Sequence, residues 1–223
     1  MTDDRLIVAL DLPSLKEAQK IVRLLSPIVS FYKIGMRLFT AAGPEAVKMV
    51  QEAGGKVFLD LKFHDIPNTV AEACDVAVGL GISMLNVHAS GGREMLQAAT
   101  KAVRGRAILI GVTVLTSESG DSKDRVVELA KLCQESGLGG IVCSPHETKE
   151  VRKICGDQFV IVTPGVRPEF YSKSDDQRRT ATPKTALTNG ATYIVVGRPI
   201  LEATDPLGAA KKLLEEIAST EKR

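Results

Sequence analysis

Apolar residues recur along the chain in short runs, each rich in Val, Ile, Leu or Phe and too short to form an amphipathic helix. Several runs are apolar almost throughout, a pattern typical of strands that are buried on both faces of a parallel sheet. Eight of these runs are predicted to be β-strands: residues 5–11, 31–35, 56–62, 84–88, 107–112, 140–144, 159–163 and 192–197.

The segments between the predicted strands show helical periodicity, with recognisable residues at their ends. Ser14 and Glu17 form a capping box at the start of one segment, and Ser144 and Glu147 form another. Gly and Pro at segment boundaries add start and stop signals. Helices are predicted over residues 14–25, 43–55, 67–79, 91–103, 121–137, 144–156 and 205–219.

Strand and helix alternate along the chain, which is the pattern of parallel strand–helix–strand units. Eight units in 223 residues have about 28 residues each, a natural length for one unit. An open doubly wound sheet would usually have fewer strands, and no G-x-G-x-x-G motif follows the first one. The sequence therefore predicts an α/β fold, a single-domain (β/α)8 TIM barrel over residues 1–223.

One long stretch, residues 166–182, interrupts this repeat. A chain of 223 residues is short for such a barrel, for which about 250 residues are typical. The other units therefore contain little beyond a strand, a helix and short loops. The stretch is rich in Ser, Asp, Gln and Arg, and long polar loops in compact domains are usually lids or disordered. It lies beside a predicted phosphate site, so we expect a lid that closes over the ligand and excludes water.

Composition is that of an ordinary globular protein, either an enzyme or a small-molecule binder. Hydrophobic residues make up 44% and charged residues 25% of the chain, and 29 basic against 27 acidic residues leave a net charge of +2. That balance argues against a nucleic-acid partner or an acidic membrane surface, and the lack of Trp argues against aromatic platforms for single-stranded bases. No apolar stretch approaches the roughly 20 residues of a membrane span.

The four cysteines form no C-x-x-C pair, and no His lies at zinc-finger spacing from them. We expect all of them to be small buried apolar residues. The N-terminal residues include acids and lead directly into a predicted strand, so we do not expect them to form a signal peptide. A reducing cytoplasm is the expected location.

Charged side chains end or follow the predicted strands, and the active site of this fold lies at the C-terminal ends of the strands. Because side chains alternate between the two faces of a strand, Asp60 and Lys62 point together into the barrel mouth while Leu59 faces the helices. We expect four charges of alternating sign to converge there: Lys33, Asp60, Lys62 and Asp65. Such a cluster is either a structural ion-pair network or a preorganised electrostatic site with a lysine acid.

The loops after the seventh and eighth strands predict a phosphate site, as in many barrels of this kind. They read T-P-G-V-R at residues 163–167 and G-R-P at residues 197–199. Glycine lets backbone N–H groups approach an anion, and the Arg167 and Arg198 guanidinium groups offer planar donor forks. The alternative is a pair of glycine turns with surface arginines.

A metal site is not expected at this mouth. His64 and His88 lie near it, and two histidines with an aspartate would suit a metal, as in the sugar-phosphate epimerases of this fold. Lysines in the same place would repel a divalent cation. We therefore expect both histidines to be structural.

Six motifs follow one another along the chain. They are A-L-D at residues 9–11, K-I-G at 33–35, D-L-K-F-H-D-I-P-N-T at 60–69, T-P-G-V-R at 163–167, D-Q at 176–177 and V-G-R-P at 196–199. Together they resemble the orotidine 5′-monophosphate decarboxylase family, in its compact bacterial form. The D-x-K-x-x-D part also occurs in related sugar-phosphate lyases and decarboxylases, but its extension to D-I-P-N-T and the preceding K-I-G are specific.

The resemblance implies a cofactor-independent decarboxylation of orotidine 5′-monophosphate to uridine 5′-monophosphate, the last step of de novo pyrimidine nucleotide synthesis. It implies that Lys62 is the general acid that protonates the pyrimidine carbon as carbon dioxide leaves. Asp60 would lie against the substrate carboxylate, and Lys33 would extend the charge array. Asp65 would complete the partner's site across the interface of a homodimer with shared active sites.

The resemblance also implies the contacts to the nucleotide. Asp11 would bind the ribose hydroxyls, helped by Thr69 from the neighbouring subunit. Thr116 would contact the pyrimidine, and Pro164 is a further implied substrate-binding residue. The residues implied to bind the phosphate are Arg167, Gln177, Gly197 and Arg198.

Two other functions remain open from the sequence. One is a metal-dependent sugar-phosphate lyase, decarboxylase or epimerase on the same barrel. The other is a protein that binds a phosphorylated ligand and has lost its chemistry, although the four charges of the array are all present.

Overall fold

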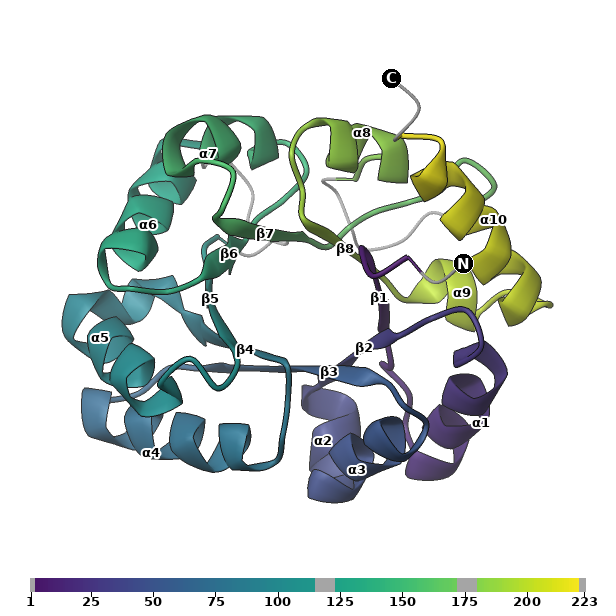
Figure 1. Cartoon of the computed structure of the whole chain (residues 1–223), viewed down its shortest axis with the longest axis horizontal. Coiled ribbons are helices and arrows are strands. Elements are labelled where there is room, and N and C mark those ends of the chain that lie inside the picture. The colour runs from purple at the N-terminus through teal and green to yellow at the C-terminus, as the bar shows by residue number, and fades with distance from the viewer. Residues whose placement is uncertain (1–2, 115–122, 172–179, 221–223) are drawn as a thin grey trace.

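The apolar runs pair in chain order into a closed parallel barrel (Figure 1). The computed structural model describes residues 3–114, 123–171 and 180–220. The barrel closes because β8 pairs with β1, with Leu6 opposite Ile194 and Val8 opposite Val196. The predicted (β/α)8 fold is therefore confirmed. Its strands are β1 (Leu6–Ala9), β2 (Phe31–Gly35), β3 (Lys56–Phe63), β4 (Met84–His88), β5 (Ile108–Val112), β6 (Gly140–Val142), β7 (Val160–Thr163) and β8 (Tyr193–Val196).

Helices surround the barrel on its outer side (Figure 1). The described ones are α1 (Leu15–Leu25), α2 (Met36–Ala42), α3 (Pro44–Glu52), α4 (Pro67–Gly79), the 3-10 turn η1 (Ala89–Gly91), α5 (Gly92–Val103), α6 (Lys123–Glu135), α7 (Thr148–Cys155), α8 (Pro183–Thr188), α9 (Arg198–Leu201) and α10 (Pro206–Ala218). The sequence patterns predict neither α2 nor α8, which are short and bury one and two side chains respectively. None of the helices in the described ranges has the length and apolarity needed to cross a membrane.

The two predicted capping boxes have different outcomes. Ser14 is the N-cap of α1, and its hydroxyl accepts a hydrogen bond from the Glu17 N–H, as expected. The prediction at Ser144 is wrong, because α7 begins only at Thr148. Pro145 follows Ser144 directly, and the Glu147 N–H bonds to the Ser144 carbonyl across four residues. Proline at the second position favours such a β-turn, so the chain turns once before the helix begins.

Two buried apolar layers follow from the alternation of side chains along the strands. One layer fills the barrel interior: Ile7, Ala9, Phe31, Phe58, Met84, Ile110, Val162 and Val195. Their strand neighbours, such as Val57 and Leu59, pack against the helices. The predicted faces of the third strand are thus confirmed, and an apolar plug lies below the charged mouth of the barrel.

Candidate active site

A cavity of about 660 Å³ opens at the C-terminal ends of the strands. Its volume lies within the range of small-molecule sites. It is lined by residues from or just after most of the strands, including Asp11 after β1, Lys33 in β2 and Asp60 and Lys62 in β3. The sequence prediction of where a site would lie on this barrel therefore agrees with the position of the cavity.

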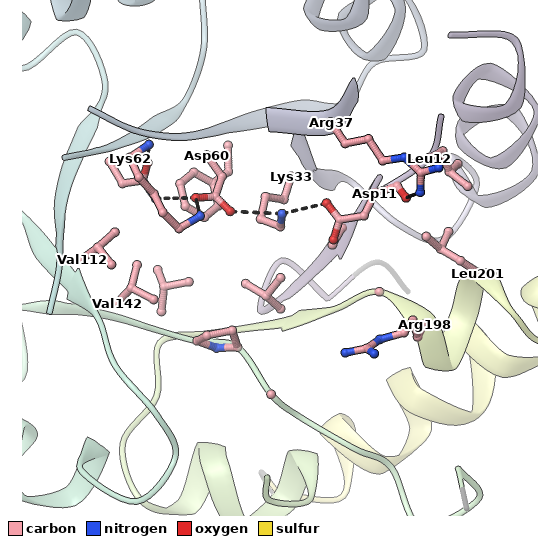
Figure 2. Close-up of a pocket in the computed structure, with 18 of the residues that line it drawn as sticks. Asp11, Leu12, Lys33, Arg37, Asp60, Lys62, Val112, Val142, Arg198 and Leu201 are labelled. Carbon is pink, nitrogen blue, oxygen red and sulfur yellow. Dashed lines mark hydrogen bonds and ion pairs between the residues drawn. The ribbon is translucent and has the colours of Figure 1, made fainter. Parts of the chain in front are cut away.

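Four charged side chains form a row along one side of this cavity (Figure 2). The Lys33 Nζ atom lies 3.1 Å from Asp11 Oδ1 and 3.1 Å from Asp60 Oδ2. The Lys62 Nζ atom lies 2.5 Å from Asp60 Oδ1. The order Asp11, Lys33, Asp60, Lys62 alternates in sign, so each interior member has an opposite charge on both sides. We call this set the charge row.

Asp65, the expected fourth member, lies outside the cavity of its own chain. It is exposed two residues beyond β3, and its Oδ1 atom accepts a hydrogen bond from the Ile66 N–H at 2.6 Å. Thr69, in the first turn of α4, is also exposed and does not line the cavity. The chain turns away from the mouth before Pro67, where α4 begins, and within one chain Asp11 takes the place expected for Asp65.

The buried centre of the charge row is strongly ionised. Burial alone would raise the pKa of Asp60, but the charges of Lys33 and Lys62 outweigh it and lower that pKa to about 2. Burial likewise opposes the charged form of Lys33, but the Asp60 and Asp11 carboxylates raise its pKa. The lowered pKa of Asp60 corresponds to about 2 kcal/mol of stability. That contribution is complete above roughly pH 4 and is lost as the pH falls through the folded-state value.

The buried amide of Asn86 links two members of the row. Asn86 lies in β4 and is 1% exposed. Its Nδ2 atom donates to Asp60 Oδ1 at 2.6 Å, and its Oδ1 atom accepts from the Lys62 N–H at 2.8 Å. The sequence places Asn86 near a strand end but gives it no role. The available signal is a polar residue in the middle of that strand, between Leu85 and Val87 and on the inner face with Met84.

The backbone of Lys62 has an unusual conformation. Its φ of 53° lies in the left-handed region, which costs a non-glycine residue about 1–2 kcal/mol. The pairing of β3 with β4 also shifts register between Leu59 and Phe63. An irregularity of this kind redirects a side chain at the end of a strand.

Three of the predicted phosphate residues, Arg167, Gly197 and Arg198, line the same cavity as the charge row. Arg198 faces the charge row across the cavity (Figure 2). Pro164 also lines the cavity. A Cβ atom added to Gly197 would lie 3.9 Å from Asp11 Oδ2, so the loops after the last and the first strands are close neighbours.

The two ends of the cavity differ in polarity. Val112 and Val142 lie at the end near Lys62, and Arg37, Leu12 and Asp11 lie at the other end (Figure 2). The Arg37 Nη1 atom donates to the Asp11 carbonyl at 3.3 Å. The sequence does not single out Arg37, because it belongs to none of the motifs. It lies in α2, which the sequence patterns do not predict. Near Lys62 the apolar wall limits the solvent screening of charge.

Known proteins of one family are similar to this chain over most of its length. The profile of the "Orotidine 5'-phosphate decarboxylase / HUMPS family" matches residues 4–213. The chain belongs to this family. The orotidine 5′-phosphate decarboxylase of Moorella thermoacetica is 51% identical, and the match covers 96% of this chain and 92% of the relative. The orotidine 5′-phosphate decarboxylase of Nitrosospira multiformis is 48% identical, and the match covers 97% of this chain and 95% of the relative.

A solved structure supports the same assignment of the chain to the orotidine 5′-phosphate decarboxylase family. The orotidine 5′-phosphate decarboxylase from Lactobacillus acidophilus superposes with a TM-score of 0.83 at 38% identity, and the match covers 96% of this chain and 99% of that chain. The family expected from the motifs is therefore confirmed.

Two residues that the resemblance to orotidine 5′-phosphate decarboxylases implies, Thr116 and Gln177, lie outside the described residues. The same holds for residues 172–179 of the predicted lid. At the near end of that segment, the Arg167 guanidinium lies 5.6 Å from the centre of the Tyr171 ring.

Histidines and cysteines form no metal cluster in the part of the chain that the structure describes. The His64 and His88 rings are 5.5 Å apart, and neither lines the cavity. All four cysteines are buried, and burial raises the pKa of Cys74 and of Cys133 to about 12. These two thiols are therefore protonated at neutral pH, as expected of apolar core residues.

Proposed function

We propose that this chain catalyses the cofactor-independent decarboxylation of orotidine 5′-monophosphate to uridine 5′-monophosphate, the last step of de novo pyrimidine nucleotide synthesis. The observation that carries the proposal is the Lys62 ammonium, 2.5 Å from Asp60 Oδ1 beside an apolar end of the cavity. Membership of the family and the names of relatives about 50% identical support it. The four free, buried thiols favour a reducing cytoplasm as its location.

The chemistry follows from where charge develops. When the bond to the carboxylate breaks, carbon dioxide leaves and the electron pair stays on the pyrimidine carbon. The Lys62 ammonium stabilises that negative charge and then donates a proton to the carbon, forming the new C–H bond. Such a contact is strongest where water is excluded. Asp60, next to the substrate carboxylate, would repel it and so destabilise the bound substrate relative to the transition state.

The rest of the cavity would bind the nucleotide. Asp11 would bind the ribose hydroxyls, Thr116 would contact the pyrimidine, and Pro164, which lines the cavity, would contact the substrate. Arg198, Gly197, Arg167 and Gln177 would bind the phosphate, and residues 166–182 would close over it. Phosphate contacts lie far from the reacting carbon, so their binding energy can drive closure and orientation at that carbon.

A direct assay tests the function. The purified chain is mixed with orotidine 5′-monophosphate, and the ultraviolet absorbance is followed with and without a chelator. Conversion to uridine 5′-monophosphate at the same rate in both samples is expected. Loss of activity with the chelator would favour the metal-dependent lyase or epimerase, and binding of uridine 5′-monophosphate without turnover would favour a ligand-binding protein.

We propose further that the chain acts as a homodimer in which Asp65 and Thr69 complete the partner's site. Both are exposed and lie outside the cavity of their own chain. Ile66, between them, is 66% exposed, and burying a large apolar side chain of this kind at an interface is favourable. The D-x-K-x-x-D motif would thus serve two cavities.

Mixing two inactive variants tests the shared site. Asp65→Asn and Lys62→Ala subunits are each expected to be inactive alone. After subunit exchange, a mixed dimer has one cavity that carries both defects and one that carries neither, so activity should return to about half of that of the unmodified dimer per mixed dimer. Absence of recovery, with exchange demonstrated by mass spectrometry, would exclude a contribution of Asp65 in trans.

Arg198→Ala is expected to weaken phosphate binding more than it slows chemistry. A charge-assisted hydrogen bond contributes about 1.5–3 kcal/mol, so KM should rise roughly 10- to 100-fold while kcat falls less. Steady-state kinetics measure both values. Arg93→Ala is the control, because Arg93 forms an exposed ion pair with Glu135 on the outer surface. Unchanged kinetics in Arg198→Ala would place the anion site elsewhere.

A further inference from the structure

The side chain of Asn86 is buried beside the charge row, and both ends of its amide are bonded. It lies in β4 with 1% exposure, next to Leu85 and Val87, which pack against the helices. Burying an amide without partners is costly, so such a group persists only where its hydrogen bonds are made. Both of its partners, the Asp60 carboxylate and the Lys62 N–H, belong to residues of the charge row.

The chemistry of the two partners fixes the orientation of the amide. A main-chain N–H only donates, so the Asn86 Oδ1 atom faces Lys62. A carboxylate only accepts, so the Nδ2 atom faces Asp60. Aspartate and leucine have similar size, but aspartate would present an acceptor to the Asp60 carboxylate and leucine would present nothing to either partner. Asparagine therefore matches the two partners by its donor and acceptor together.

The contacts close a ring. The Lys62 N–H donates to Asn86 Oδ1, the Asn86 Nδ2 atom donates to Asp60 Oδ1, and the same Asp60 oxygen lies 2.5 Å from the Lys62 Nζ atom. Both the main chain and the side-chain end of Lys62 are thus positioned through one amide. This ring of contacts would hold the left-handed φ of Lys62, since an uncommon conformation persists only where surrounding contacts determine it.

We propose that Asn86 is a positioning residue of the decarboxylation site, whose amide fixes the Lys62 backbone and the Asp60 carboxylate together and so places the Lys62 ammonium. The inference rests on the proposed function, because that function makes the Lys62 ammonium the proton donor. A reacting group that is displaced by about 1 Å can lose 100-fold in rate.

Asn86→Ala tests the proposal. We expect kcat for orotidine 5′-monophosphate to fall about 100-fold, whereas the Kd of uridine 5′-monophosphate changes less than about threefold, since the residues proposed to bind ribose and phosphate are untouched. The Asn86 hydrogen bond is one of the contacts that lower the pKa of Asp60. Its loss raises that pKa, so the acid limb of the kcat profile should move to higher pH. The Lys62 amide should also exchange its hydrogen faster.

Val87→Ala is the matched control. Val87 is the next residue of the same strand, is fully buried and faces the helices. Its truncation should lower the unfolding midpoint but leave kcat per folded molecule, the pH profile and the Lys62 amide exchange unchanged. If Asn86→Ala does not fold, Asn86→Ser is measured in the same way, because a hydroxyl can bond one of the two partners.

The outcomes separate this inference from the proposed function. If the unmodified chain does not decarboxylate orotidine 5′-monophosphate, the proposed function fails, and the amide exchange of Lys62 still reports on the ring of contacts. If the unmodified chain is active and Asn86→Ala keeps kcat within threefold, the positioning role is overturned. If Asn86→Ala lowers kcat but changes neither the acid limb of the kcat profile nor the hydrogen exchange of the Lys62 amide, Asn86 has a purely structural role.

Discussion

Lys62→Ala is expected to abolish turnover of orotidine 5′-monophosphate while the barrel stays folded. The substitution removes the proposed proton donor and the charge proposed to stabilise the developing carbanion, and these two effects contribute about 10²–10⁴-fold and 10²–10³-fold in other enzymes. We therefore expect kcat to fall by at least about 10⁴-fold. Asp60 keeps its contacts with Lys33 and Asn86, and the left-handed backbone at position 62 is no worse for alanine than for lysine.

The measurement combines kinetics with thermal unfolding. Lys56→Ala is the control, since Lys56 lies at the other end of β3 and forms an exposed ion pair with Asp4 at 2.7 Å. The control should keep full activity. A Lys62→Ala variant of near-native activity would refute the proposed mechanism, and one that unfolds would show that Lys62 is needed for the fold.

Asp60→Asn is expected to reduce kcat about 10³-fold and to lower the free energy of unfolding by about 2 kcal/mol at pH 7. The Asp60 carboxylate contacts two ammonium groups, and a neutral amide leaves both without that counter-charge. Because Asp60 is the larger of the two carboxylate contributions to the raised pKa of Lys33, this pKa should fall in the variant. The alkaline limb of the kcat/KM profile should then move to lower pH.

Urea unfolding and pH–rate profiles measure these effects. Asp75→Asn, in an exposed ion pair with Arg106 on the outer surface, makes the same chemical change away from the cavity and should alter neither quantity by much. If Asp60→Asn kept kcat within tenfold, the charge row would be an ion-pair network of structural importance only.

The barrel is predictable from the sequence because local alternation already separates its two layers. In a regular strand Phe58 and Leu59 point to opposite faces, and in the barrel Phe58 points inward and Leu59 outward. The apolar runs also give the order of the strands along the chain. The same alternation predicts that Asp60 reaches the mouth. The resemblance to the family then implies roles that no local pattern contains, such as the one proposed for Asp65.

The ring around Asn86 is not predictable in this way. It depends on the register between β3 and β4, which shifts between Leu59 and Phe63, and alternation within one strand does not report pairing between strands. The left-handed φ of Lys62 is equally hidden, since a lysine gives no signal for it. Likewise, Asp11 is recognisable as a strand-end residue, but its contact with Lys33 requires the pairing of β1 with β2.

The pairing of β1 with β8 has a consequence for synthesis of the protein. Asp11 follows the first strand and Arg198 follows the last, so the two walls that would bind ribose and phosphate come from opposite ends of the chain. A growing chain on the ribosome has its first strand long before its last, and the cavity cannot form until β8 has emerged. A nucleotide that contacts both walls would stabilise the pairing of β1 with β8. The first and last strands would therefore separate less often when the product is abundant.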